Sequence, residues 1–552
     1  MLRPLAPAIA LLAALAAFAP AQPVEVLHPV APFLQRLGEK GVIDPGFWKT
    51  LPRDKAEVLH ALRQAEARKE TLGAWDRRKL ERYLNEFDPA LRRADTRLRY
   101  ADSSFDVVGS VEYHTGIYWR DSIPGPEAFA DGGLMPGVEG TYREKMYFAA
   151  SGSLNMERGW RDRFTQNYDP REGLSYGSRN HGQNISDVGT WDALRAVVGF
   201  GDKGLRIEAG QDWNQWGPGH WQHATLGARP HFWVADSLGP SDSNSAIGYP
   251  GNASDFMRTR RGYRNPGEGP PLAQVRLRIA GKNWQYTKIV AQRTSLHADS
   301  TARLVAHRLE VRLGNFTLGG VEMLATARPL DGLLLLPGVP LKIAEHDGGD
   351  RDNAAISGDV EWRWGSGTLY GELLLDDYGG PPLDYWVNKF AVTVGGSWQD
   401  PFGIPAELRA EYARVNPFVY AHYLQGTQMQ SYGALLGSAL PPNSQAVFAS
   451  AAFPLPGNVE GGVEWRFRQR DLKSRGSSIF DDYIVNTPPH SSEFLLRDVE
   501  TRNEITASVD WSWRRYVTLR AGLGGLWVSN WKGYAGESLA TPTTFGEVRL
   551  KY

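Results

Sequence analysis

The chain has 552 residues, and its 61 Lys and Arg nearly balance its 62 Asp and Glu, so a net charge of −1 gives no general attraction to nucleic acid or anionic lipid. It contains no cysteine, which excludes disulfides, zinc–thiolate sites and a thiol nucleophile. The 19 Trp, 22 Tyr and 21 Phe are typical either of the aromatic girdles of membrane barrels or of carbohydrate-binding surfaces.

Residues 1–21 predict a secretory signal peptide. Arg3 is followed by an apolar run from Leu5 to Phe18 and then by the small-residue cleavage pattern Ala19-Pro20-Ala21. We therefore expect an exported protein whose mature chain begins at Gln22. No other stretch reaches the roughly 20 apolar residues of a membrane helix, so membrane insertion would have to depend on strands.

Residues 22–96 predict a small helical bundle. Three apolar stripes recur at helical spacing, each with charged and polar residues on its other faces. The stripes are Val30, Phe33, Leu34 and Leu37; Val58, Leu59, Leu62 and Ala65; and Leu80, Tyr83, Leu84 and Phe87. We expect the bundle in the periplasm, at the end of a barrel or in its mouth. A separate domain on a linker is the alternative, but strands follow Asp88-Pro89 without a long flexible stretch.

Residues 97–552 alternate apolar and polar side chains with a period of two. Ile505, Val509 and Trp513 alternate with polar neighbours, and the chain ends on a strand in which Val548, Leu550 and Tyr552 share one face. A terminal aromatic strand of this kind is typical of a closed antiparallel outer-membrane β-barrel. A β-sandwich also alternates, but this length would overfill one. At roughly 10 residues per strand we predict about 18 strands.

Several Pro- and Gly-rich stretches between the strands are predicted to be extracellular loops, because insertions are tolerated there. They are Asp121–Gly140, Arg161–Asn184, Gly239–Pro271, Leu336–Asn353, Leu435–Pro456 and Leu472–Arg497.

The most distinctive segment runs from Ala209 to Gly219 and ends in Trp-Gly-Pro-Gly. Gly217, Pro218 and Gly219 predict a sharp structural turn, because glycine tolerates positive φ and proline fixes its own. With the segments 369–377 and 409–417, this stretch resembles the capsule-assembly proteins of the Wzi type. One departure is Ala439-Leu440-Pro441-Pro442-Asn443, where the family has Gly-Pro-Asn after a short spacer, so this turn is expected to differ in shape.

The resemblance implies an 18-stranded outer-membrane barrel with a periplasmic helical bundle, acting as a surface lectin that holds exported capsular polysaccharide on the cell. The expected partners are capsular or other surface polysaccharide and outer-membrane lipid, and the expected state is a monomer without a cofactor. A porin-type diffusion channel is the alternative. The two differ in the lumen, because a porin needs an open, charged constriction.

The candidate polysaccharide-binding residues combine aromatic rings that could stack on sugars with charged and amide groups that could bond hydroxyls. They could equally be lumen and girdle residues that fix the fold, and this reading is favoured for the Trp-Gly-Pro-Gly core. The candidates are Asp212, Trp213, Trp216, His220, Trp221, His223, Arg229, Glu372, Asp376, Glu411, Arg414, Asn416, Tyr420 and His422.

The sequence favours neither a metal site nor an enzyme. His220 and His223 lack the helical HExxH context, and the acidic loop 347–353 lacks the spacing of a calcium loop. Glu372 and Glu411 could in principle serve a glycosidase, but opposed charges in a barrel lumen normally pair across strands. Neither a Gly-x-Ser-x-Gly elbow nor a Walker or dinucleotide motif is present.

Overall fold

The computed structural model describes most of the chain between Val24 and Lys551. The residues outside the description are 1–23, 25, 27, 45, 47–48, 89–97, 121–126, 144–145, 159–183, 186–187, 202–203, 228–270, 295–300, 350, 383, 425, 432–433, 439, 480–491, 514–515, 531–534 and 552. The predicted signal peptide, Arg229 and the terminal Tyr552 therefore lie outside the described residues.

The described chain forms a closed antiparallel barrel of 18 long strands, as the alternation predicts. Each strand pairs with its neighbour in sequence, and β24 closes the barrel by pairing with β3, where Lys551 lies opposite Glu112. The strands are β3 (Phe105–Arg120), β4 (Glu127–Tyr142), β5 (Met146–Arg158), β7 (Val188–Gly201), β8 (Leu205–Asp212), β10 (Leu272–Ala280), β11 (Trp284–Thr294), β12 (Thr301–Leu313), β13 (Phe316–Thr326), β14 (Asn353–Trp364), β15 (Gly367–Asp377), β16 (Lys389–Gln399), β17 (Glu407–Val415), β20 (Ser444–Leu455), β21 (Val459–Arg470), β22 (Glu500–Trp513), β23 (Val517–Ser529) and β24 (Ser538–Lys551). The short strands β2 (Arg99–Ala101) and β6 (Asn184–Ile185) pair with β3 and β7.

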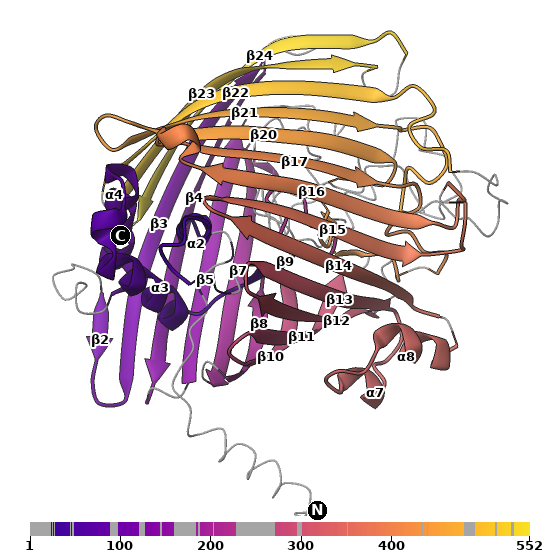
Figure 1. Ribbon diagram of the computed structural model, residues 1–552, viewed down its shortest axis with the longest axis horizontal. Helices are drawn as coiled ribbons and strands as arrows, with labels where there is room; N and C mark the ends of the chain where they lie inside the picture. Colours follow the sequence, from indigo (N-terminus) through magenta and orange to yellow (C-terminus); the bar gives the residue numbers. More distant parts are fainter. Residues whose placement is uncertain are drawn as a thin grey trace, which may run out of the picture.

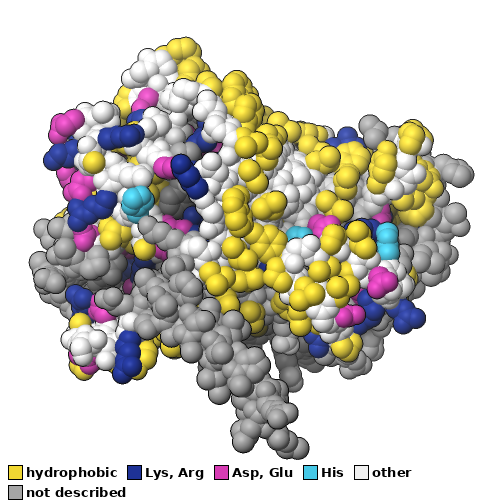
Figure 2. Space-filling view, turned by 60° about the horizontal axis from the view of Figure 1, so that its bottom comes forward, with side chains coloured by type: hydrophobic (Ala, Val, Ile, Leu, Met, Phe, Trp, Pro, Cys, Tyr) yellow, Lys and Arg dark blue, Asp and Glu magenta, His cyan; other side chains and the backbone are white. Residues whose placement is uncertain are grey.

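Alternation along the strands gives the barrel an apolar outside and, apart from the buried core described below, a polar inside. On β22 the side chains of Ile505, Val509 and Trp513 are exposed on the outer face, while Glu504 and Asp510 face the lumen. Figure 2 shows hydrophobic side chains gathered along the outside of the barrel, with charged side chains concentrated toward its ends. This is the distribution that a barrel embedded in a lipid bilayer requires.

The two ends of the barrel differ in the length of their connections. At one end, called here the short-turn end, β12 and β13 are joined by Gly314 and Asn315, and β14 and β15 by Gly365 and Ser366. At the other, the long-connection end, β17 leads to β20 through residues 416–443 and β21 leads to β22 through residues 471–499.

Two of the six predicted loops are wrong. Most of Asp121–Gly140 belongs to β4, and much of Leu435–Pro456 belongs to β20. The glycines and prolines that suggested loops are accommodated inside these strands. Leu336–Asn353 and Leu472–Arg497 do contain connections at the long-connection end, whereas Arg161–Asn184 and Gly239–Pro271 lie almost entirely outside the described residues.

Three N-terminal helices form where the stripes predict them: α2 (Val30–Glu39), α3 (Lys55–Ala67) and α4 (Ala74–Phe87), with a 3-10 turn η1 (Lys69–Thr71) between the last two. Asp54 begins α3 by accepting the backbone N–H of Glu57 at 2.8 Å in a capping box. The stripes pack into one core, in which Leu34, Leu37 and Leu62 are fully buried. Figure 1 shows the helices grouped near the C-terminus of the chain, at the short-turn end.

Two short helices, α7 (Gly332–Leu335) and α8 (Leu341–Asp347), occupy the connection between β13 and β14. Figure 1 shows them beside the barrel wall, away from the N-terminal helices. Within the described ranges, every helix is too short or too polar to cross a membrane.

Candidate functional site

Two connections from the long-connection end fold into the lumen and bring most of the candidate residues together. They are residues 213–227, which follow β8, and residues 416–443, which follow β17. Their apolar side chains share one core with the inward face of β11 to β17 and β20. Its members from the two connections include Trp216, Ala224, Leu226, Phe418, Val419, Tyr420, Met429, Leu435 and Leu440.

The Trp-Gly-Pro-Gly turn is built against the barrel wall. Trp216 is 0 % exposed. Gly217 has φ +99°, and a Cβ added there would lie 3.0 Å from an Oε1 atom of Glu372. Gly217 is therefore required both by its backbone conformation and by the close approach of a carboxylate.

Glu411 on β17 holds the inward-folded segment through its backbone. Its carboxylate accepts the N–H groups of His220 at 2.6 Å and Gln222 at 2.8 Å, and that of Trp221 at 3.3 Å. The hydroxyl of Tyr370 donates to the same carboxylate at 2.6 Å. A buried carboxylate with several charge-assisted hydrogen bonds acts as an anchor for the chain.

Glu372 and Asp376 on β15 anchor the two connections in the same way. Glu372 accepts the N–H of Ala224 at 3.1 Å, and Asp376 accepts the N–H of Tyr420 at 2.7 Å. The Tyr420 hydroxyl then donates to the carbonyl of Ala224 at 2.9 Å, which ties one connection to the other. Glu372, Asp376 and Glu411 are thus three of the four candidate carboxylates, and each accepts backbone N–H groups.

Asp212 and Trp213 lie at the end of β8, next to buried arginines and the N-terminal segment. Asp212 forms ion pairs with Arg195 at 2.8 Å and Arg276 at 2.7 Å, and it is 1 % exposed. Trp213 packs against Val26 and Leu51. His223 is buried as well.

The remaining candidates are held by local contacts. His220 Nδ1 lies 3.2 Å from a guanidinium nitrogen of Arg409, and the ring of Trp221 stacks on that of Phe448 at 5.4 Å between centroids. Arg414 donates to Asn416 at 2.8 Å and lies 3.7 Å above the ring of Phe494, and His422 Nδ1 lies 2.7 Å from the hydroxyl of Thr427.

The structure adds aromatic residues that the sequence reasoning missed. Tyr378 follows β15 and is 62 % exposed, and Tyr423 is exposed in the connection after β17. Tyr385 lies against Trp386, whose ring contacts Phe418 at 6.1 Å. An aromatic side chain in an irregular connection carries no periodic signal, so only the folded chain shows that these rings gather at the long-connection end.

The N-terminal segment meets the inward-folded connection inside the barrel. The strand β1 (Thr50–Leu51) pairs with β9 (Gln215–Trp216), and Thr50 lies opposite Trp216. The hydroxyl of Thr50 donates to Glu310 at 2.6 Å and accepts from Arg308 at 2.9 Å. The N-terminal segment enters from the short-turn end and the connection after β8 enters from the long-connection end. The two segments are therefore hydrogen-bonded to each other in the lumen.

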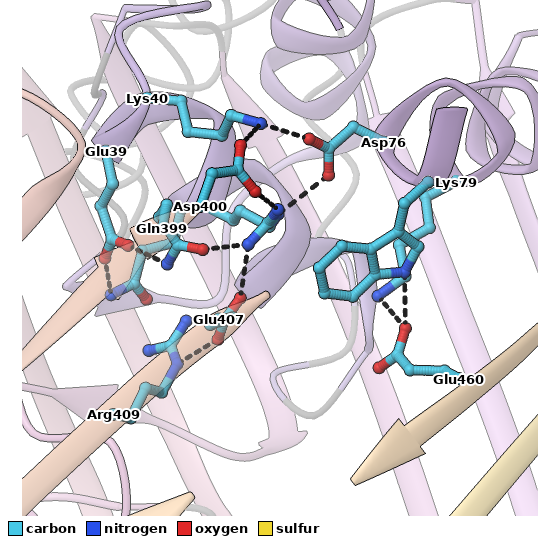
Figure 3. Close-up of polar contacts among 12 residues, drawn as sticks. Glu39, Lys40, Asp76, Lys79, Gln399, Asp400, Glu407, Arg409 and Glu460 are labelled. Carbon is cyan, nitrogen blue, oxygen red and sulfur yellow. Dashed lines mark hydrogen bonds and ion pairs between the residues drawn. The ribbon is translucent and has the colours of Figure 1, made fainter. Parts of the chain in front are cut away.

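Arg36 fastens helix α2 to α4 and to the barrel wall through three carboxylates, Asp76, Asp400 and Glu407, which Figure 3 shows close together. It is 2 % exposed and pairs with Asp76 of α4 at 2.8 Å, with Asp400 at 3.0 Å and with Glu407 of β17 at 3.5 Å. Burial alone would raise the pKa of Asp76, but the ion pairs with Arg36 and Lys40 outweigh it, and the pKa is lowered. Asp76 is thus held as a carboxylate at neutral pH.

Other ion pairs attach the helical segment to strands around the circumference of the barrel. Each joins a side chain of residues 49–88 to an inward-facing group on a different strand. The pairs are Lys49–Glu361 on β14, Lys55–Glu139 on β4, Arg206 on β8 with Asp54, Arg278 on β10 with Glu57, Lys79–Glu460 on β21 and Lys551 on β24 with Glu86. Residues 24–88, called here the plug, therefore close the short-turn end.

Among the described residues, no group of three or more His, Asp or Glu side chains is arranged to hold a metal ion. The contacts that the candidate residues make in the described site are hydrogen bonds, ion pairs and ring stacking.

Comparison with known proteins relates the chain to others through its fold. No protein-family model and no curated protein matches the sequence. Among solved structures, Wzi of Escherichia coli, an outer-membrane protein involved in group 1 capsule assembly and a carbohydrate-binding β-barrel, matches 96% of this chain and 99% of its own with a TM-score of 0.54 and 14% identity. OccAB1 of Acinetobacter baumannii and OccK2 of Pseudomonas aeruginosa match 81% of this chain, with TM-scores of 0.44 and 0.43 and identities of 9% and 8%. They are covered over 96% and 97% of their own lengths. The chain therefore has an outer-membrane β-barrel fold, and in that fold it is similar to Wzi along almost its whole length.

Proposed function

We propose that this protein is a non-enzymatic outer-membrane protein of the Wzi type that binds capsular or other surface polysaccharide at its long-connection end. The observation that carries the proposal is that chain segments enter the lumen from both ends and meet there. The plug is attached to strands all around the short-turn end, and it is paired through Thr50 and Trp216 with a connection folded in from the opposite end. A barrel built in this way is suited to holding a polymer at its surface, with the plug on the periplasmic side.

The aromatic residues at the long-connection end form the proposed contact surface. Tyr378, Tyr385, Trp386 and Tyr423 belong to connections that are held to the barrel by Asp376 and Asn388, since Asn388 donates to the carbonyls of Gly380 and Pro382. Rings fixed in place lose little entropy when a sugar stacks on them. Of the residues predicted from sequence, the partly exposed Arg414 and His422 are retained in the proposal. The buried anchors support them. His220 and Trp221 lie deeper in the lumen, against Arg409 and Phe448.

The test compares cell-bound with released polymer. A clean deletion should leave polymer synthesis intact and release polymer into the medium. Tyr378→Ala and Tyr423→Ala should each weaken retention about tenfold, since truncating a binding hot spot costs roughly 1–3 kcal/mol. Tyr100→Ala is the matched control, because Tyr100 is as exposed as Tyr378 but lies on β2 at the short-turn end. Normal cell-bound polymer in the deletion strain, or hydrolysis of polymer by purified protein, would contradict the proposal.

A porin-type channel is the second candidate, and one observation favours it. Inward-facing charged side chains on β21 and β22, including Glu464, Arg466 and Glu504, are only partly buried, so this side of the lumen contacts water. Planar-bilayer recordings separate the two functions. Large, steady conductance from the full-length protein, unchanged when residues 28–88 are removed, would establish the channel.

A further inference from the structure

The connection between β13 and β14 lies on the outer wall of the barrel. Its helices α7 and α8 pack on Val305 of β12, Leu324 of β13 and Ala354 of β14. These three residues lie opposite one another in the sheet, and their neighbours along each strand, such as Ala306 and Met323, belong to the lumen core. The hairpin formed by residues 330–347 therefore covers the face that looks away from the lumen.

Beneath this hairpin lies a polar cluster that is out of place on a lipid-facing wall. His307 and Glu322 form a 2.9 Å pair on adjacent strands, and Lys288 is on the next strand along. The hairpin supplies hydrogen-bond partners to two of these side chains. Leu341 donates its N–H to Glu322 at 2.7 Å, and Lys288 donates to the carbonyl of Leu336 at 2.6 Å. The hairpin thus replaces hydrocarbon as the neighbour of these groups.

The hairpin also reaches far along the wall. The N–H of Gly338 donates to the hydroxyl of Tyr286 at 2.8 Å, and Tyr286 is the third residue of β11, close to the short-turn end. The strand continues for eight more residues to Thr294, roughly 26 Å at about 3.3 Å per residue. Because barrel strands are tilted by roughly 35–45°, this length spans only about 20 Å along the membrane normal. The apolar band of an outer-membrane barrel is only about 25 Å tall. The tip of the hairpin therefore lies within the height of that band.

The large exposed side chains in the middle of the hairpin are apolar, and its exposed Asp331, His346 and Asp347 lie at its two ends. The ten residues from Gly332 to Leu341 include no charged side chain. Leu333, Leu335, Leu336 and Ile343 are exposed, with Ile343 reaching 67 %. On the same outer face of the neighbouring strands, Ile356 lies opposite Glu322 and is exposed, as is Leu318. Large exposed apolar patches mark contact with membranes or partners, and the position of this patch on the outer wall selects the membrane.

We infer that the hairpin of residues 330–347 is an intramembrane element, which turns Leu333, Leu335, Leu336 and Ile343 toward lipid acyl chains and shields Lys288, His307 and Glu322 from them. The inference rests on the outer-membrane barrel fold and is independent of polysaccharide binding.

The absence of cysteine from the chain makes the test direct. Leu335→Cys and Ile343→Cys are labelled separately with an environment-sensitive fluorophore, and the full-length protein is reconstituted into phosphatidylcholine vesicles. Quenching is measured with doxyl groups on the acyl chains and with aqueous iodide. Leu373→Cys, on the outer wall of β15, is the lipid reference, and Lys473→Cys, in the β21–β22 connection, is the water reference.

Both hairpin labels should be quenched by doxyl lipid as strongly as the label at position 373, and protected from iodide to the same degree. Quenching by iodide equal to that at position 473, without quenching by lipid, would overturn the inference. Protection from both quenchers would also overturn it, because the face would then be covered by protein. Each variant must first migrate as a closed barrel in unheated gels, and Leu333→Cys and Leu336→Cys replace any variant that does not.

Discussion

Thr50 of the plug lies opposite Trp216 of the inward-folded connection, in a two-residue antiparallel pairing inside the barrel. Trp216 is buried in the lumen core, while Thr50 is bonded to Glu310 and Arg308 of β12. The plug and the connection therefore share one set of contacts with the wall. A substitution that releases the connection should consequently also loosen the plug near Thr50 and speed its hydrogen exchange.

Glu411→Gln should release the segment 213–227. The substitution removes the charge that accepts N–H groups from His220, Trp221 and Gln222, and it places an amide donor among those donors. Hydrogen bonds to charged groups contribute about 1.5–3 kcal/mol, so the segment should open locally while the barrel stays closed. Chymotrypsin should then cut near Trp221.

The matched control for this change is Glu464→Gln, which alters a half-buried, lumen-facing carboxylate on β21 that is paired with Arg466. Equal chymotrypsin cleavage in both variants would show that Glu411 is not the anchor. Cleavage confined to Glu411→Gln, together with faster hydrogen exchange in residues 49–51, would show that the connection and the plug are coupled.

Arg36→Met should undock the plug from the wall. It removes the guanidinium that Asp76, Asp400 and Glu407 share and leaves these carboxylates with their ion pairs to Lys40 and Arg409. Breaking a buried pair costs roughly 3–5 kcal/mol when no other partner remains, so the cost here should be smaller than that. The helices keep their own core, so we expect faster hydrogen exchange across residues 30–87 and larger conductance in planar bilayers. Lys69→Met, at an exposed position in η1, is the control and should change neither. Unaltered exchange in Arg36→Met would refute its role as the fastener.

The barrel was predictable because alternation is imposed by the environment at nearly every strand position. Each side chain on β22 faces either lipid or the lumen. The sequence therefore alternates apolar and polar residues, as in Ile505, Thr506 and Ala507. Similarly, the stripe of Val30, Phe33, Leu34 and Leu37 predicts α2 because a helix at a polar boundary needs one apolar face.

The course of the connections was not predictable in the same way. The segment 213–227 has no periodicity, and its inward fold depends on Glu411 and Glu372, which are distant in sequence. A lumen carboxylate has the same place in the alternation whether it binds sugar, pairs with arginine or caps backbone N–H groups. The Leu-rich run at 333–336 is likewise too short to show whether it faces water, protein or lipid.

Acid should loosen the plug. Burial acts to raise the pKa of Asp76 and Glu86, but the ion pairs of Asp76 with Arg36 and Lys40, and of Glu86 with Lys551 and His28, lower both below their ordinary values of 3.8 and 4.5. A carboxylate whose pKa is lowered by folding stabilises the fold above its ordinary pKa and loses that contribution as the pH falls toward its folded pKa. Asp54 opposes the effect, because burial and Glu57 raise its pKa.

The expected outcome is that hydrogen exchange in residues 30–87 accelerates as the pH is lowered from about 5 to about 3, after correction for intrinsic exchange, while the barrel strands remain protected. Each unit by which a pKa is lowered corresponds to about 1.4 kcal/mol. Asp76→Asn should exchange faster at neutral pH and depend less on pH. A plug equally protected at both ends of this range would contradict the prediction.

Gly217→Ala tests how tightly the turn is fitted to the wall. At φ +99° an alanine is strained by roughly 1–3 kcal/mol. Its Cβ would also lie 3.0 Å from Glu372 Oε1, and Glu372 cannot retreat without lengthening its 3.1 Å bond from Ala224. We expect the change to lower thermal stability of the lumen core, with the burial of Trp216 reported by its fluorescence. Gly358→Ala is the matched control on β14, where an added Cβ meets nothing within 4 Å and φ is not positive. If the two variants have equal thermal stability and Trp emission, then residues 216–219 do not depend on the glycine at position 217.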